Sequence, residues 1–107
     1  MMIQFIKQLF GLAPKINYAD LVKNGAVILD VRSKGEYSSG CIKGSINIPV
    51  DQLRNNLGKL KDKNLPIITC CASGMRSASA KSILKSEGYE EVYNGGGWMS
   101  LKMKISS

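Results

Sequence analysis

Short apolar runs alternate along the chain with segments whose apolar residues recur every three or four positions. Runs of this length are typical of strands that are buried on both faces of a parallel sheet. We predict four such strands, at residues 26–29, 45–48, 67–70 and 91–93. Because predicted helices separate the strands, the pattern indicates an α/β domain with a mainly parallel sheet and helices on both faces.

Residues that commonly start or stop helices bound the other segments. Asn17 and Ser33 are candidate N-caps, whereas Gly40 and Gly88 are stop signals. We predict helices at residues 17–22, 33–37, 51–57, 76–87 and 98–104. No internal repeat interrupts this alternation, so we interpret residues 15–107 as one domain.

The first fourteen residues have a different pattern. Residues 1–10 carry apolar side chains at helical spacing, and Gly11 and Pro14 end that pattern. We interpret residues 1–14 as an N-terminal amphipathic segment or tail. One interpretation packs it on the domain. The other makes it a membrane-surface or targeting segment, although no clear small-residue cleavage site precedes Pro14.

The chain is basic, with a net charge of +7, and its lysines are scattered. Aromatic residues do not interleave with them, as a single-strand nucleic-acid surface would require. We therefore predict a solvated basic surface and no nucleic-acid partner. No run of eighteen apolar residues is present, so we expect no stable membrane insertion.

Cysteine and histidine usage limits the chemistry further. Three cysteines, two of them adjacent, do not form a disulfide framework, which predicts a reducing, cytoplasmic location. A periplasmic location follows instead if residues 1–14 act as a signal. There is no histidine, which excludes histidine metal ligands and a Cys–His pair. We expect no metal and no cofactor, and a nucleophile activated by its local electric field.

The stretch after the third strand carries the chemistry. Cys71 ends the apolar run, a loop containing Gly74 follows, and a helix begins near Arg76. Unpaired N–H groups at a helix N-terminus and a nearby arginine favour a thiolate or a bound anion. We therefore predict Cys71 as the nucleophile, and expect the substrate to be bound by the residues that follow it, Ala72, Ser73, Gly74, Met75, Arg76 and Ser77.

Polar residues follow the other strands. Asp30, Cys71 and Asn94 each come directly after a predicted strand, so we expect them to surround one crevice at the carboxyl edge of the sheet. Asp30 and Arg32 predict a buried or half-buried ion pair that fixes the loop, with Glu36 as a further candidate partner of Arg32. Direct substrate binding is the alternative role for this group. We interpret residues 94–97 as a flexible wall of the pocket.

Three stretches together resemble the rhodanese family of sulfurtransferases. The family's active-site loop, C-x-x-G-x-R-S, matches residues 71–77. Residues 29–49 and 88–98 match two further family stretches in the same order, so the resemblance covers residues 16–101. It implies a rhodanese-like α/β fold with a five-stranded parallel core.

The resemblance also implies an activity. Cys71 would take a sulfane sulfur from a small anionic donor such as thiosulfate and become a persulfide. The amides of residues 72–76 would surround the added sulfur, and Arg76 would help to bind the donor. Cyanide, a thiol or a protein would accept the sulfur. The family usually has a histidine where this chain has Cys41, which we interpret as a small buried side chain or as a redox partner.

Two alternatives stay open. Counted from Cys70, the spacing to Arg76 is C-x5-R, as in cysteine phosphatases. We prefer Cys71 because Cys70 continues the apolar strand, and because no recognisable general-acid motif is present. The second alternative is a non-enzymatic sulfur carrier or interaction module.

Overall fold

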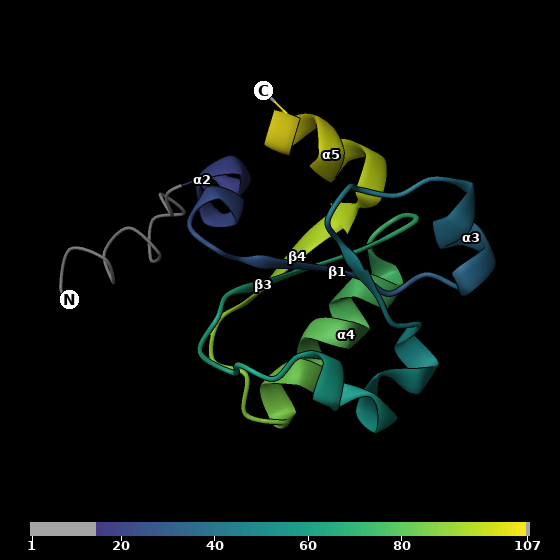
Figure 1. The fold of residues 1–107 in the computed structure, drawn as a ribbon, viewed down its shortest axis with the longest axis vertical. Helices are drawn as coiled ribbons and strands as arrows, with labels where there is room; N and C mark the ends of the chain where they lie inside the picture. The colour runs from purple at the N-terminus through teal and green to yellow at the C-terminus, as the bar shows by residue number, and fades with distance from the viewer. Residues whose placement is uncertain (1–14, 107) are drawn as a thin grey trace, which may run out of the picture.

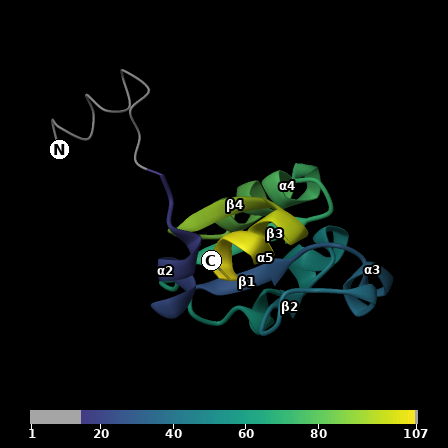
Figure 2. The ribbon, with the colours of Figure 1, turned by 90° about the horizontal axis from the view of Figure 1, so that it is seen from above.

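The computed structural model describes residues 15–106, so the interpretations of residues 1–14 as a packed helix, tail or signal lie outside the described part. The sheet runs in the order β2-β1-β3-β4, and every pair of neighbouring strands is parallel. Figure 2 shows this order from above. The strands are β1 (Val27–Asp30), β2 (Ile46–Asn47), β3 (Ile67–Cys71) and β4 (Val92–Gly97).

Helices cover both faces of the sheet. In Figure 1, α2 and α5 lie on one side of the strands and α4 lies on the other. Two 3₁₀ helices accompany α4 on its side, where Leu53 and Leu60 join the core cluster that contains Leu84 of α4. The helices are α2 (Tyr18–Lys23), α3 (Lys34–Ser39), η1 (Val50–Asn55), η2 (Leu57–Lys59), α4 (Met75–Ser86) and α5 (Trp98–Ser106).

The predicted α/β class, with a parallel sheet and helices on both faces, is confirmed. The five-stranded core implied by the family resemblance is wrong for residues 15–106, which form four strands, the number that the apolar runs predict. The described connection between β2 and β3 contains the two 3₁₀ helices and loops, and no strand.

Two predicted elements differ from the structure in their details. The α-helix expected at residues 51–57 is the 3₁₀ helix η1, because Asn55, Asn56 and Gly58 are poor α-helix formers. The strand expected at residues 45–48 contains only Ile46 and Asn47, since Pro49 has no N–H to continue the ladder.

Alternation along β3 divides the core into two clusters. Ile67 and Cys71 contribute to the cluster on the α4 side of the sheet. Ile68 and Cys70 contribute to the cluster on the α2 and α5 side, where they join Leu101. Successive side chains of a strand point to opposite faces, so the two adjacent cysteines lie in different layers of the protein.

The end of β4 approaches its neighbours very closely. Residues 94–97, which we expected as a flexible wall of the pocket, continue the strand. A Cβ atom on Gly95 would lie 2.8 Å from Ile68 Cγ2 and 2.8 Å from the Thr69 carbonyl oxygen. A Cβ atom on Gly97 would lie 3.1 Å from the Ala72 carbonyl oxygen. The glycines therefore allow β4 to pack against β3 and against the start of the Cys71 loop.

This packing predicts opposite effects for two glycine substitutions. Gly95→Ala forces a methyl group against backbone and should destabilise the protein by about 1–3 kcal/mol. Gly35→Ala, in α3, places its methyl group in open space, and should stabilise the protein by up to about 1 kcal/mol. Urea unfolding of both variants measures the two effects. Equal effects of the two substitutions would contradict the close approach of β4.

Candidate active site

Cys71 is the last residue of β3, and its side chain lies on the α4 side of the sheet. Only 1% of the residue is exposed. Its Sγ accepts the backbone N–H of Gly74 at 2.9 Å and that of Ser77 at 3.3 Å. Two N–H donors directed at one sulfur favour negative charge on it.

The loop above this sulfur is formed by the residues that we expected to bind substrate. Ala72, Ser73 and Met75 are exposed, and Met75 is 82% exposed. Gly74 has a φ of +108°, which only glycine adopts readily, and it is the N-cap of α4. This turn directs two amides back toward Cys71.

The donors differ in part from those expected at residues 72–76. Gly74 belongs to that range, whereas Ser77 lies one residue beyond it. The reason is the position of Ser77 in the first turn of α4. N–H groups in the first turn of a helix have no carbonyl partner within the helix, so they are available to an acceptor at its N-terminus.

Cys70 has a different environment. It is fully buried in the cluster on the α2 and α5 side. Burial, followed by the nearby Asp30 carboxylate, raises the pKa of its thiol to about 12, although the Arg32 guanidinium partly opposes them. A buried thiol with a raised pKa is a poor nucleophile near neutral pH.

The predicted ion pair after β1 is present and buried. Arg32 Nη2 lies 2.6 Å from Asp30 Oδ2, and the two residues are 4% and 0% exposed. The Arg32 guanidinium also donates to the carbonyl oxygens of Glu36 at 3.3 Å and Gly40 at 2.7 Å. It lies 4.5 Å from the centre of the Trp98 ring. These contacts fix the start of the β1–α3 connection.

The expected pairing of the Arg32 and Glu36 side chains is wrong. The Glu36 carboxylate instead forms a two-point ion pair with Arg76, at 2.7 Å and 3.0 Å. The fully buried Asp30 carboxylate requires a positive partner, and Arg32 is two residues away on the same strand end. Glu36 is left to bridge α3 to the first turn of α4.

Glu36 also caps its own helix. Its carboxylate accepts the N–H of Ser33, and the Ser33 hydroxyl accepts the N–H of Glu36, which confirms Ser33 as the N-cap. The Arg76 guanidinium, followed by the Ser33 N–H, lowers the pKa of Glu36 to about 2. The same pairing raises the pKa of Arg76. Both groups are therefore charged across the physiological pH range.

The three residues expected to surround one crevice are only partly brought together. Asp30 is fully buried and held by Arg32. Asn94 lies within β4, and its Oδ1 accepts the Ser77 hydroxyl at 2.6 Å. Thr69 also contacts Ser77, with 2.6 Å between the two hydroxyl oxygens. We missed Thr69 in the sequence, although a polar residue inside an apolar strand is a signal for a buried hydrogen bond.

Cys41, the third cysteine, is half-buried rather than fully buried, and the thiols of Cys41, Cys70 and Cys71 are all free. Within residues 15–106, no three Cys, Asp or Glu side chains are close enough together to hold a metal ion. In the same described range, no helix has both the length and the apolar character needed to cross a bilayer.

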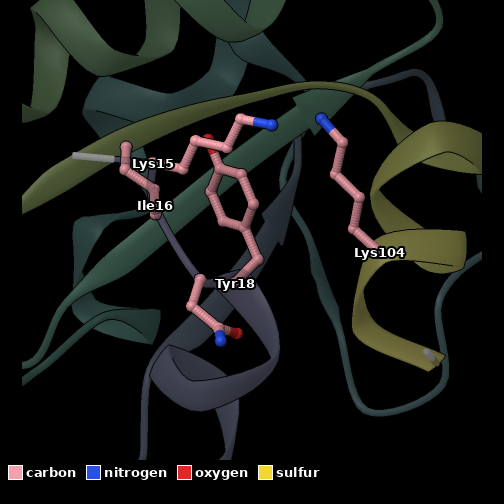
Figure 3. Close-up of a pocket in the computed structure, with 5 residues that line it drawn as sticks. Lys15, Ile16, Tyr18 and Lys104 are labelled. Carbon is pink, nitrogen blue, oxygen red and sulfur yellow. The ribbon is translucent and has the colours of Figure 1, made fainter. Parts of the chain in front are cut away.

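A cavity of about 650 Å³ lies apart from the Cys71 loop. Its lining comes from the chain around the start of α2 and from the last turns of α5 (Figure 3). The ammonium groups of Lys15 and Lys104 both point into the space beside the Tyr18 ring. None of the lining residues belongs to the stretch from Cys71 to Ser77.

Fold and site together define a class of protein. It is an α/β domain that presents a cysteine on an amide-lined loop at the carboxyl end of a parallel strand. The Rhodanese-like domain family matches residues 15–104, and the chain belongs to that family.

The relatives include enzymes of sulfur transfer. The chain is similar to the thiosulfate sulfurtransferase PspE of Escherichia coli, with 34% identity over 76 residues, 70% of this chain and 73% of PspE. It is 32% identical over 95 residues to a putative mitochondrial thiosulfate sulfurtransferase of Schizosaccharomyces pombe, covering 76% of this chain and 66% of that protein. A solved structure of an E. coli rhodanese with anions has a TM-score of 0.67 and 32% identity, over 71% of this chain and 91% of that one.

The Glu36–Arg76 pair predicts a specific pH dependence of stability. The folded state lowers the pKa of Glu36 from 4.5 to about 2. The stabilisation is therefore complete above about pH 5 and is lost as the pH falls toward 2. Glu36→Gln retains an acceptor for the Ser33 N–H but removes the charge. The variant should be less stable than the parent at pH 7, and the difference should disappear near pH 2.

Urea unfolding at pH 7, 5, 3 and 2 measures this difference. Glu90→Gln, at an exposed carboxylate, is the charge-matched control and should remain parallel to the parent. A stability difference for Glu36→Gln that stays constant over the whole pH range would show that the ion pair is not its cause.

Proposed function

We propose that this protein is a sulfurtransferase that moves a sulfane sulfur from a small anionic donor such as thiosulfate to a thiophilic acceptor through a persulfide on Cys71. The observation that carries the proposal is the pair of hydrogen bonds from the Gly74 and Ser77 amides to Cys71 Sγ. Membership of the rhodanese-like family and similarity to thiosulfate sulfurtransferases support it.

The first step forms the persulfide. Cys71 loses its proton to solvent, and the thiolate attacks the outer sulfur of thiosulfate. The new S–S bond forms as the bond to the SO₃ group breaks, and sulfite leaves with the electron pair. The negative charge moves to the terminal sulfur of the persulfide, and the Gly74 and Ser77 amides lie where they offset charge on the cysteine.

The second step returns the enzyme to its starting state. The carbon of cyanide, or a thiolate of another molecule, attacks the terminal sulfur of the persulfide. The S–S bond breaks, and its electron pair returns to Cys71 as a thiolate. The products are thiocyanate or a new persulfide on the acceptor. This two-step, ping-pong cycle requires no net oxidant or reductant.

In this proposal Arg76 helps to bind the anionic donor, and Glu36 holds the guanidinium in one plane through its two-point contact. The Asp30–Arg32 pair acts as structural support rather than as a substrate contact, since both groups are buried and engaged with each other. We propose small anions and thiols, or a protein thiol, as partners, without nucleic acid or membrane, and the cytoplasm as the location.

Two observations argue against phosphate-ester hydrolysis through Cys70. Its thiol lies in the opposite core layer from the Arg76 loop and has a pKa of about 12. Cys71 itself is only 1% exposed, which suits attack on a small donor better than on a bulky ester. A carrier without turnover differs from the proposed enzyme only in the second step.

The proposal predicts that Cys71→Ser abolishes sulfur transfer from thiosulfate to cyanide, whereas Cys70→Ala retains most of it. Thiosulfate treatment should add one sulfur to the parent and to Cys70→Ala, as measured by intact mass, and cyanide should remove it with release of thiocyanate. Cys41→Ser is a further control for the third thiol.

Three results would contradict the proposal. The first is a sulfur adduct that maps to Cys70 instead of Cys71. The second is hydrolysis of aryl phosphates at a higher rate than sulfur transfer. A stable adduct that neither cyanide nor a thiol removes would favour the non-enzymatic carrier instead.

A further inference from the structure

Asn94 lies on β4, and its side chain contacts the Cys71 loop. Its Oδ1 accepts two hydrogen bonds, from the Ser77 hydroxyl at 2.6 Å and from the Gly96 N–H at 3.0 Å. Its Nδ2 lies 3.5 Å from the Gly74 carbonyl oxygen, a long and weak contact. One side chain therefore touches three residues around the loop.

Two of these three residues also contact the sulfur. Gly74 and Ser77 donate their backbone N–H groups to Cys71 Sγ. The loop turns sharply between them, and the Asn94 side chain contacts both residues, Ser77 at its hydroxyl and Gly74 at its carbonyl oxygen. Asn94 thus links the two residues whose backbone N–H groups bond to the candidate nucleophile.

The hydrogen positions follow from the chemistry of the groups. The Gly96 N–H can only donate, so the atom of Asn94 that faces it is the amide oxygen, and the amide nitrogen faces Gly74. Ser77 has one hydroxyl proton, which it gives to Asn94. Across the 2.6 Å contact between the two hydroxyls, only Thr69 can then donate, and the carbonyl oxygens of Ser77 at 3.0 Å and Tyr93 at 3.2 Å are further acceptors for its proton.

The result is a directed chain of hydrogen bonds across three elements. It starts at Thr69 in β3, passes through Ser77 in α4 and ends at Asn94 in β4. Thr69 and Ser77 are fully buried, so a missing partner within the chain would leave an unsatisfied polar group. Thr69 lies two residues before Cys71 on the same face of the sheet. The chain therefore fixes α4 relative to the strand that carries the nucleophile.

We propose that Asn94 is a positioning residue for the sulfur chemistry of Cys71, and that it keeps the Gly74 and Ser77 amides directed at the sulfur without adding negative charge. This inference rests on the proposed function for the identity of the reaction, but the alignment of the amides acts on the thiolate before any donor binds. Aspartate would have nearly the same shape and would accept the same two hydrogen bonds. Its charge, however, would oppose a thiolate or a persulfide anion two hydrogen bonds away.

Two variants test the proposal, with Asn64→Ala as the matched control at an exposed asparagine outside the loop. Asn94→Ala removes all three contacts and should lower the rate of Cys71 alkylation by iodoacetamide at pH 7 by about tenfold, the loss expected for about one hydrogen bond. Asn94→Asp should move the alkylation profile to higher pH, because the charge disfavours the thiolate. Alkylation is measured at Cys71 by fragment-ion mass spectrometry.

The same variants are assayed for sulfur transfer to cyanide and for thermal unfolding. Asn94 is exposed, and the Ser77 hydroxyl can turn to Thr69 when Asn94 is removed, so we expect both variants to fold. A cooperative melting transition verifies it. Asn94→Ala should lose sulfur transfer in parallel with alkylation, and Asn64→Ala should change neither.

Several outcomes would overturn the inference. Alkylation of both Asn94 variants at the parental rate and pH would show that the side chain does not align the amides. Normal alkylation with lost sulfur transfer would make Asn94 a substrate contact instead. If the parent transfers no sulfur but Asn94→Asp still shifts the pH profile of alkylation, the proposed function is refuted while Asn94 remains a positioning residue.

Discussion

The amide hydrogen bonds to Cys71 Sγ impose the constraint on which the rest of the structure depends. A backbone N–H can reach a side chain three and six residues earlier only if the chain reverses direction immediately after the strand. Gly74 makes this reversal with its positive φ, and α4 begins at the next residue. The sheet order then matters, because β3 is central and holds the start of the loop between β1 and β4. A loop on an edge strand would lack one of these two supports.

Charged groups support the loop from the other side. Asp30 and Arg32 form a buried pair, and Arg32 binds the Gly40 carbonyl oxygen at the end of α3. The α3 helix is thereby held in place, and it presents Glu36 to Arg76 in the first turn of α4. The buried pair is costly to desolvate, so its value lies more in fixing this arrangement than in stabilising the fold. The half-exposed Glu36–Arg76 pair holds α3 against the first turn of α4 through its two-point geometry.

Most of the elements could be predicted from the sequence because each one has a local signal. Apolar runs mark β1 and β3, and Asn17 and Ser33 cap α2 and α3 as expected. The extension of β4 through three glycines could not be predicted, because glycine in isolation indicates a turn. Its reason is the short distance to Ile68 and Thr69, which only the folded sheet reveals.

Some residues of the candidate site could likewise be predicted from the sequence, and others could not. Cys71 and Gly74 are identifiable from spacing, since a loop between a strand and a helix is a local feature. The partner of Glu36 is not, because Arg76 lies forty residues further along the chain, and Arg32 is much closer in sequence. The roles of Thr69 and Asn94 depend on the parallel register that pairs them across β3 and β4. Non-local hydrogen bonds of this kind leave little trace in a single sequence.

The adjacent cysteines show how strand geometry decides a chemical question that spacing leaves open. Either cysteine lies at a reasonable distance from Arg76 along the chain. A strand nevertheless alternates its side chains, so a shift of one residue exchanges the two core layers. Cys71 shares its layer with α4 and its amides, whereas Cys70 shares its layer with Leu101 and lies near the Asp30 carboxylate. One thiol thus accepts two backbone N–H groups, whereas the other is buried near a carboxylate that raises its pKa. The register of β3 therefore places Cys71, and not Cys70, next to the amide donors of the loop.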